Sequence, residues 1–327
     1  MTMQWKTRIT ELLGCEYPLL QGALSRFGYW KFVAAVCETG AHGCLTAAVS
    51  RTPERLRNDI RKCREATDKP FSVNISIGNC PHEDKMLDVI LDEGIDVVET
   101  AVFNADAHGK RIKDAGRKWV HKTATVKHAL HAQDQGADAV IIVGLEGIGY
   151  KNIHQLPTMV TAVEAARQIR IPLVIAGGLG DARGMLAVLA TGADGVMMGT
   201  RFMATEECPV PARYKHNMIE LSVNDPRLRH RVLAEPDPAE YEEVMKLRDQ
   251  LPLDRWLPRL EKVMLKDEDW REAYRMWEAP AKYLGTLVSM AVGVIHDIPT
   301  CQELVRRIVT EAEALARKHP YPSDLST

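Results

Sequence analysis

The sequence predicts a (β/α)8 TIM barrel with an additional C-terminal helical segment near the barrel mouth. Eight short apolar runs alternate with helix-like segments over the first two thirds of the 327 residues, and the last two runs end in glycine turns. Runs this short, without strict alternation, are typical of strands buried on both faces, as a parallel sheet under helices requires. A strand and a helix repeated eight times form a closed parallel barrel.

The predicted strands each end in a turn-prone or polar residue. They cover residues 18–21, 43–46, 71–75, 97–101, 119–123, 139–143, 173–176 and 195–199. Helices are expected between them. The clearest signal is Thr52-Pro53-Glu54, which combines an N-cap residue with proline at the first helical position and opens a helix over 52–67.

Beyond residue 202 the alternation stops, and apolar residues follow a helical spacing interrupted by prolines. Helices are expected over 212–222, 239–251, 255–266, 268–276, 281–294 and 300–318. We therefore divide the chain into a barrel (1–205), a helical cap or insertion (206–300), and a terminal barrel helix with its tail (301–327).

Two glycine turns follow the seventh and eighth strands: Ala176-Gly177-Gly178 and Gly199-Thr200. In barrels of this class the loops after these strands usually bind phosphate through backbone N–H groups. Glycine lets the backbone approach an anion closely because it has no Cβ. The joint placement of the two turns predicts a phosphate-bearing ligand.

Four motifs in order resemble the nitronate monooxygenase family, formerly the 2-nitropropane dioxygenases. They read PLLQGAL from residue 18, FSVNI from 71, IAGGLGDARG from 175 and MGTRFMATE from 198. The family also includes flavin-dependent enoyl-acyl-carrier-protein reductases and NADH:quinone reductases. The resemblance covers about residues 5–318 and implies an oxidoreductase with FMN bound at the C-terminal end of the barrel. NADH or NADPH is a plausible electron donor, although no motif supports it.

Lys122, at the end of the fifth strand, is the first catalytic candidate. A positive group near N1 and the C2 carbonyl of a flavin favours its reduced form, and the resemblance implies a flavin-contacting lysine at this position. His121 should face the other side of the strand and be structural. The expected cofactor-binding residues are Gln21, Gly22, Ala23, Leu24, Asn74, Lys122, Glu146, Ile148, Ala176, Gly177, Gly178, Gly199 and Thr200.

The loop after the sixth strand departs from the family pattern. Tyr150 occupies the place of the histidine that the resemblance implies as the base towards neutral nitroalkanes. A phenol, with an ordinary pKa of about 10, is a poor base but a good hydrogen-bond donor or general acid. His154 could replace the base if the loop folds back. Glu146 could bind a ribityl hydroxyl or face solvent.

Composition fits a compact enzyme acting on a small-molecule substrate: 46% of residues are hydrophobic, 26% are charged, and the net charge is -2. This net charge does not predict the positively charged surface that nucleic-acid binding requires. No apolar stretch is long enough to cross a membrane, and no signal peptide is recognisable. The seven scattered cysteines predict a cytoplasmic protein without a disulfide framework or zinc site. The sequence leaves the oligomeric state open, a homodimer included.

Three functions remain open. The first is an FMN-dependent oxidoreductase that acts through flavin N5 on a small activated carbonyl or enoyl substrate, such as a thioester or quinone. The second is a nitronate monooxygenase that uses O2. The third is a non-redox lyase or isomerase that uses the flavin as a scaffold. Tyr150 favours the first over the second, although a pre-formed nitronate needs no base.

Overall fold

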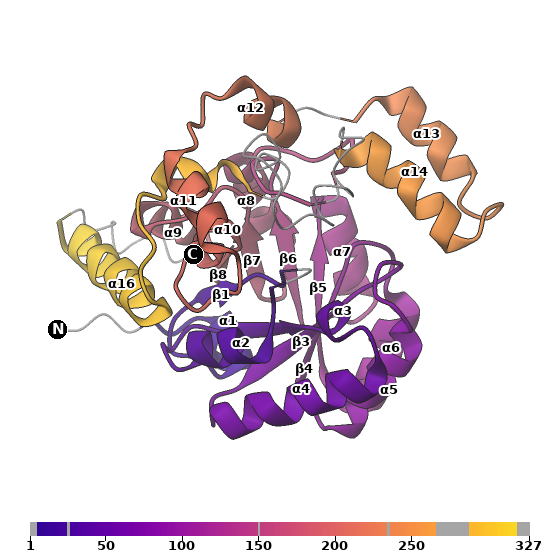
Figure 1. Ribbon diagram of the computed structural model, residues 1–327, viewed down its shortest axis with the longest axis horizontal. Helices are drawn as coiled ribbons and strands as arrows, with labels where there is room; N and C mark the ends of the chain where they lie inside the picture. The colour runs from indigo at the N-terminus through magenta and orange to yellow at the C-terminus, as the bar shows by residue number, and fades with distance from the viewer. Residues whose placement is uncertain (1–4, 25–26, 150, 234–235, 266–287, 319–327) are drawn as a thin grey trace.

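The computed structural model describes residues 5–24, 27–149, 151–233, 236–265 and 288–318. Eight parallel strands form a barrel surrounded by helices (Figure 1), and the strands pair in the order β1-β8-β7-β6-β5-β4-β3-β2. An isolated parallel bridge between Leu20 and His42 brings β1 beside β2. The His42 N–H donates to the Leu19 carbonyl, and the His42 carbonyl accepts from the Gln21 N–H. The predicted (β/α)8 class is confirmed.

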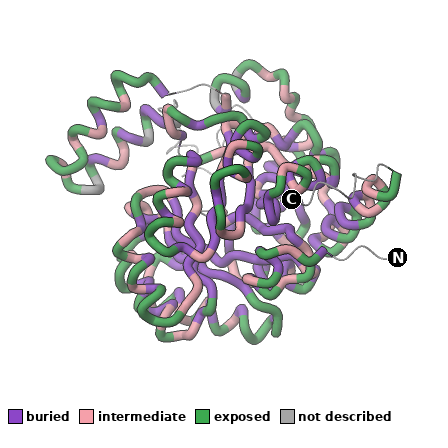
Figure 2. The backbone as a smooth tube through the Cα atoms, turned by 180° about the vertical axis from the view of Figure 1, so that it is seen from behind, coloured by how far each residue is buried: buried purple, intermediate pink, exposed green. Residues whose placement is uncertain are grey.

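All eight strands lie where they were predicted. Four have the predicted bounds: β2 (Gly43–Thr46), β4 (Val97–Ala101), β6 (Ala139–Val143) and β7 (Leu173–Ala176). Four differ by one residue at one end: β1 (Leu19–Gln21), β3 (Phe71–Ser76), β5 (Lys118–Thr123) and β8 (Gly195–Met198). The strands are buried on both faces, as Figure 2 shows for the centre of the molecule. Each strand is therefore a mainly apolar run in the sequence, and the ends of the run predict its bounds.

The helices that precede and alternate with the strands are α1 (Arg8–Leu13), α2 (Trp30–Cys37), α3 (Ala47–Ser50), α4 (Pro53–Ala66), α5 (Glu83–Asp92), α6 (Asp106–Asp114), α7 (Val126–Asp134), α8 (Thr158–Gln168) and α9 (Ala182–Leu189). The predicted cap of α4 is confirmed, because the Thr52 side chain accepts a hydrogen bond from the Arg55 N–H and Pro53 begins the helix.

The chain after β8 is mainly helical, as predicted. Its elements are α10 (Thr200–Met203), α11 (Ala212–Glu220), α12 (Pro226–Leu233), α13 (Pro238–Lys246), α14 (Leu253–Leu265), the 3-10 helix η2 (Met290–Val294) and α16 (Cys301–Lys318). The sequence pattern missed α12. The predicted helix over 268–276 lies outside the described residues.

The α-helix predicted over 281–294 is wrong in its described part, which holds only η2. The chain is extended at Ser289, whose side chain caps η2 by accepting from the Ala291 N–H. The backbone N–H of Ser289 donates to Thr200 at 3.0 Å. Because this bond to Thr200 holds the chain extended at Ser289, the helix begins after this residue, whereas the apolar spacing predicted that Ser289 lies inside a helix.

Helix α16 packs against α9 and α2 and so takes the position of the helix that follows the eighth strand (Figure 1). Helices α13 and α14 form a pair that extends from the barrel (Figure 1) around buried Trp256. The Trp256 ring contacts Phe103, in the loop after β4, at 5.3 Å between centroids. Trp256 therefore packs these helices together. In the described part of the chain, each helix is too short or too polar to cross a bilayer.

Candidate active site

The barrel interior has an apolar part and a polar part. Side chains from β1, β6, β7 and β8, together with Val97 on β4 and Val120 on β5, form one apolar cluster that includes Leu20, Ile141, Val174 and Met197. Nearer the mouth on β4 and β5, and on β2 and β3, polar side chains meet one another. These are Cys44, Asn74, Glu99 and Lys122. A polar sector in a barrel core indicates a site, because buried polar groups lower stability unless they are paired.

Glu99 is the centre of this polar sector. Its Oε1 accepts a hydrogen bond from Asn74 Nδ2 at 2.7 Å and forms an ion pair with Lys122 Nζ at 2.8 Å. The Cys44 thiol lies 3.8 Å from its Oε2. Asn74 and Glu99 are directly paired in the sheet register, whereas Lys122 pairs with Ala101. Lys122 is therefore nearer the C-terminal end of the barrel, where such enzymes bind their substrates.

Burial increases along this network with distance from the mouth. The side chain of Glu99 is 4% exposed and that of Lys122 is 17% exposed. Burial and the Glu99 charge together raise the pKa of the Cys44 thiol well above its usual range, so this cysteine is not a thiolate nucleophile. The ammonium group of Lys122 is thus held at a defined point by a deeper carboxylate.

Sequence reasoning missed Glu99. It stands alone in the apolar run Val97-Val98-Glu99-Thr100-Ala101, and a carboxylate in a strand buried on both faces needs a charged or hydrogen-bonding partner. That argument could have predicted a buried cation on a neighbouring strand.

His121 has the structural role expected for it. Its Nδ1 lies 2.8 Å from Thr100 Oγ1, which also accepts a hydrogen bond from the Trp119 indole N–H. The side chains of Trp119 and His121 contact each other on the outer side of the strand, opposite Lys122. Burial lowers the pKa of His121 to about 4, so the ring is neutral at pH 7.

The glycine turn after β7 is required by packing within the protein. Gly177 and Gly178 have φ angles of +117° and +68°, a region that favours glycine. A Cβ at Gly177 would lie 2.7 Å from Thr158 Oγ1, and one at Gly178 would lie 2.8 Å from Cβ of Glu146. The Ala176 carbonyl accepts from the Gly144 N–H at 2.8 Å. The turn thus packs against the loop after β6.

The glycine after β8 is different. Gly199 has a φ of -101°, which any residue can adopt, and a Cβ there would meet only Leu24 Cδ2 at 3.6 Å. A Cβ at Gly22 would also make only ordinary contacts, the nearest at 3.4 Å. Internal packing alone therefore does not explain these two glycines, which lie beside each other where β1 and β8 end.

Three predicted contact residues have side chains that already bond to the protein. The Thr158 N–H and the Thr158 hydroxyl each donate to Glu146 Oε2 at 2.7 Å, so Glu146 caps α8. The buried Gln21 amide oxygen accepts from the Cys44 N–H and links β1 to β2. Thr200 Oγ1 accepts two bonds from Ser289, so only its own O–H remains to donate to a phosphate.

In the described structure, no hydrogen bond or ion pair between side chains joins the other predicted residues to the Glu99 network. Ala23, Leu24 and Ile148 are partly buried, and His154 is exposed in the turn before α8. The backbone N–H of His154 donates to the Asn152 side chain at 2.9 Å. Tyr150, the principal catalytic prediction, lies outside the described residues.

The residues at the mouth fit a bound FMN in two respects. In the described part of the chain, the amides of Gly178, Leu179 and Thr200 have no hydrogen-bond acceptor, as expected of turns that bind an anion. The hydroxyl of Thr46 is buried without a partner among the described residues, and Thr46 pairs in register with Asn74, in the same layer as Glu99. An unpaired buried hydroxyl in this layer is consistent with a polar ligand.

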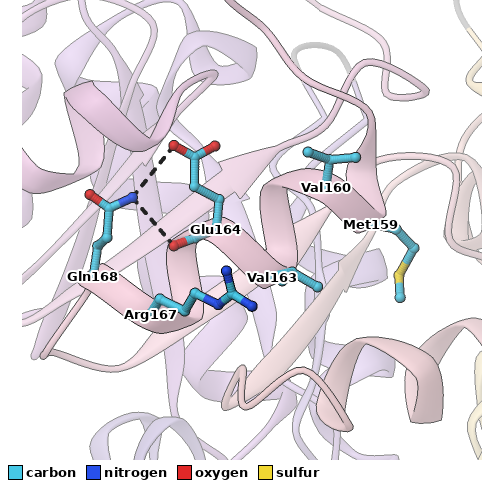
Figure 3. Close-up of a pocket in the computed structure, with 6 residues that line it drawn as sticks. All are labelled: Met159, Val160, Val163, Glu164, Arg167 and Gln168. Carbon is cyan, nitrogen blue, oxygen red and sulfur yellow. Dashed lines mark hydrogen bonds between the residues drawn. The ribbon is translucent and has the colours of Figure 1, made fainter.

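An open pocket of about 620 Å³ lies elsewhere, on the outer face of α8 (Figure 3). Its lining comes from one helix and is mainly apolar, with Met159, Val160 and Val163 exposed. None of the predicted site residues lines it. This pocket is therefore separate from the polar sector inside the barrel.

Comparison with known proteins agrees with this architecture. The family model described as nitronate monooxygenase matches residues 6–86 and 79–311. A relative from Rhodococcus jostii strain RHA1 is 30% identical over 94% of this chain and 96% of its own length, and is named (3aS,4S,5R,7aS)-5-hydroxy-7a-methyl-1-oxo-octahydro-1H-indene-4-carboxyl-CoA dehydrogenase.

A relative from Staphylococcus saprophyticus subsp. saprophyticus, named probable nitronate monooxygenase, is 25% identical over 72% of this chain and 78% of its own length. The structure of FabK from Thermotoga maritima superposes with a TM-score of 0.75 at 28% identity, covering 96% of this chain and 98% of that one. The barrel, the ordered motifs and these matches agree: this chain belongs to the nitronate monooxygenase family and is an oxidoreductase of the flavin-dependent type.

Proposed function

We propose that the protein is an FMN-dependent oxidoreductase whose substrate is an activated carbonyl or enoyl compound, in the first place an acyl-CoA thioester. The observation that carries the proposal is the partly buried Lys122 ammonium group, held towards the barrel mouth by Glu99 at 2.8 Å. The Rhodococcus relative, similar to this chain over 94% of its length and named as a carboxyl-CoA dehydrogenase, supports a thioester.

Bound FMN would supply hydride transfer through its N5 atom. The glycine turns at Gly178 and Gly199 would hold its phosphate through backbone amides, and the residues around Gly22 would pass close to the ring. Lys122 would donate a hydrogen bond to the pyrimidine edge. Tyr150 would donate a hydrogen bond or a proton to the carbonyl oxygen of the substrate. The electron donor or acceptor would be NAD(P)H or NAD(P)+.

A nitronate monooxygenase is the second candidate, because the matching family model and the Staphylococcus relative carry that name. Tyr150 argues against a neutral nitroalkane as substrate, since a phenol is a poor base at neutral pH. A pre-formed nitronate needs no base.

The experiment that separates these functions begins with titration of the purified apoprotein with FMN, FAD and riboflavin, followed by visible absorbance. We expect FMN to bind most tightly, because the sequence motifs predict one phosphate site and include no dinucleotide fingerprint. NADH, NADPH and a 2-enoyl-CoA are then added anaerobically, and propionate 3-nitronate is added in air. Reaction with a nicotinamide and the thioester supports the first function. Bleaching by the nitronate with oxygen uptake supports the second, and failure to bind any flavin would rule out both.

A further inference from the structure

The ion pair between Glu99 and Lys122 has a consequence for charge at the mouth of the barrel. Its carboxylate is held by side chains from three other strands: Lys122 on β5, Asn74 on β3 and Cys44 on β2. Because the carboxylate is 4% exposed, solvent screens it little. The mouth of the barrel therefore faces an ion pair with no net charge and a fixed geometry. Without Glu99, it would face the single positive charge of Lys122.

The buried histidine that precedes β2 does not alter this balance. His42 is also on the β2 side of the barrel, and burial lowers its pKa to about 4, so it carries no charge at pH 7. Asn74 and Cys44 contribute hydrogen-bonding groups without charge. Glu99 is thus the group in this network that offsets the positive charge of Lys122.

We propose that Glu99 is a specificity-determining positioning residue: it cancels the field of Lys122, so that the site favours neutral carbonyl substrates over anions such as nitronates. The same cancellation opposes negative charge on reduced flavin and so lowers the reduction potential relative to a site with an unpaired lysine. The inference rests on the proposed function only in requiring that a flavin bind near Lys122.

Sulfite is a suitable probe of this field. It adds through sulfur to N5 of oxidised flavin, no group leaves, and the resulting two-electron adduct carries its negative charge near the pyrimidine edge. Its affinity therefore reports positive charge at that edge, independently of any turnover. Titration of the FMN-loaded protein with sulfite, followed by loss of the visible band, measures the dissociation constant directly.

The proposal predicts an order among four proteins. Glu99→Gln should bind sulfite at least tenfold more tightly than wild type, because Lys122 is then unpaired. Glu99→Gln with Lys122→Met should bind like wild type, since both sites have no net charge. Lys122→Met alone should bind more weakly than either. The two-electron reduction potential of the flavin should rise in the variants that bind sulfite more tightly and fall in those that bind it more weakly. A tenfold change in the equilibrium constant corresponds to about 30 mV.

Cys44→Ala is the matched control, because it removes a contact to Glu99 without changing charge. If it changes sulfite affinity as much as Glu99→Gln does, the network acts through structure and the proposal is wrong. The unpaired Lys122 charge in Glu99→Gln lowers stability, so a variant that does not fold is replaced by a second contrast. Lys122→Met and the double variant then provide the same contrast without a lysine, and equal affinities would overturn the proposal.

The outcomes also separate this inference from the proposed function. A wild-type protein that binds no flavin refutes the proposed function. A wild-type protein that binds FMN and sulfite, with Glu99→Gln unchanged in both affinity and potential, refutes only the role of Glu99. A gain in affinity of Glu99→Gln for propionate 3-nitronate would extend the result from the probe to a substrate.

Discussion

At the scale of single residues, the identity of residue 150 separates two kinds of chemistry. If Tyr150 acts as a general acid, Tyr150→Phe should retain FMN and lower turnover of the thioester by about 10²- to 10⁴-fold. Stopped-flow absorbance of the flavin measures this step. Tyr150→His should introduce oxidation of neutral nitroalkanes. Efficient nitroalkane oxidation by wild type at neutral pH would contradict the assignment and direct attention to His154 or Lys151 as the base.

His42 makes a second prediction, about pH and stability. It is 2% exposed, and neither ring nitrogen has a hydrogen-bond partner in the described structure. Burial lowers its pKa from 6.5 to about 4 in the folded state, so between these values the unfolded chain binds a proton that the folded chain does not. The free energy of unfolding should therefore fall as the pH is lowered through this window, by about 3 kcal/mol in total for this residue.

His42→Leu removes this contribution and should flatten the dependence of stability on pH between 6.5 and 4. Urea unfolding at several pH values measures the effect. His121, which has a similarly lowered pKa, should leave a residual slope. The exposed His230 provides the control, since His230→Leu should keep the wild-type slope. An unchanged slope in His42→Leu would show that His42 is protonated in the folded protein.

At the scale of elements, the start of α8 depends on a residue from the preceding loop. The helix has Pro157 at its N-cap, which cannot supply a capping side chain, and Glu146 accepts from the Thr158 N–H instead. Glu146→Ala should therefore lower the free energy of unfolding by about 1 kcal/mol, measured by urea denaturation. Glu164→Ala on the same helix should change it much less, because the hydrogen bond that the Glu164 side chain accepts among the described residues is a long one, from Gln168 at 3.4 Å. Equal effects would contradict the capping role.

At the scale of the whole molecule, closure of the helical layer depends on a segment distant in sequence. Helix α16 packs between α9 and α2 and buries Leu304 at 3% exposure. Leu304→Ala should lower the free energy of unfolding by about 2 to 5 kcal/mol, as large-to-small changes in cores do. The midpoint of urea unfolding measures this. Arg317→Ala, at an exposed position, should change it by less than about 0.5 kcal/mol. A small effect of Leu304→Ala would mean that α16 is peripheral to the core.

The sequence by itself determined the barrel, since eight buried strands with their intervening helices leave few other arrangements. It also determined the position of Lys122 and the glycine turns, because carboxyl ends of parallel strands meet at one end of the barrel. Only the tertiary structure revealed Glu99 as the partner of Lys122, Glu146 as a helix cap, and Ser289 as the anchor of Thr200. Each of these contacts joins residues at least 12 positions apart. Periodicity reports which face of an element is buried, whereas a polar side chain is assigned its partner only when the strands close and place distant residues within hydrogen-bond distance.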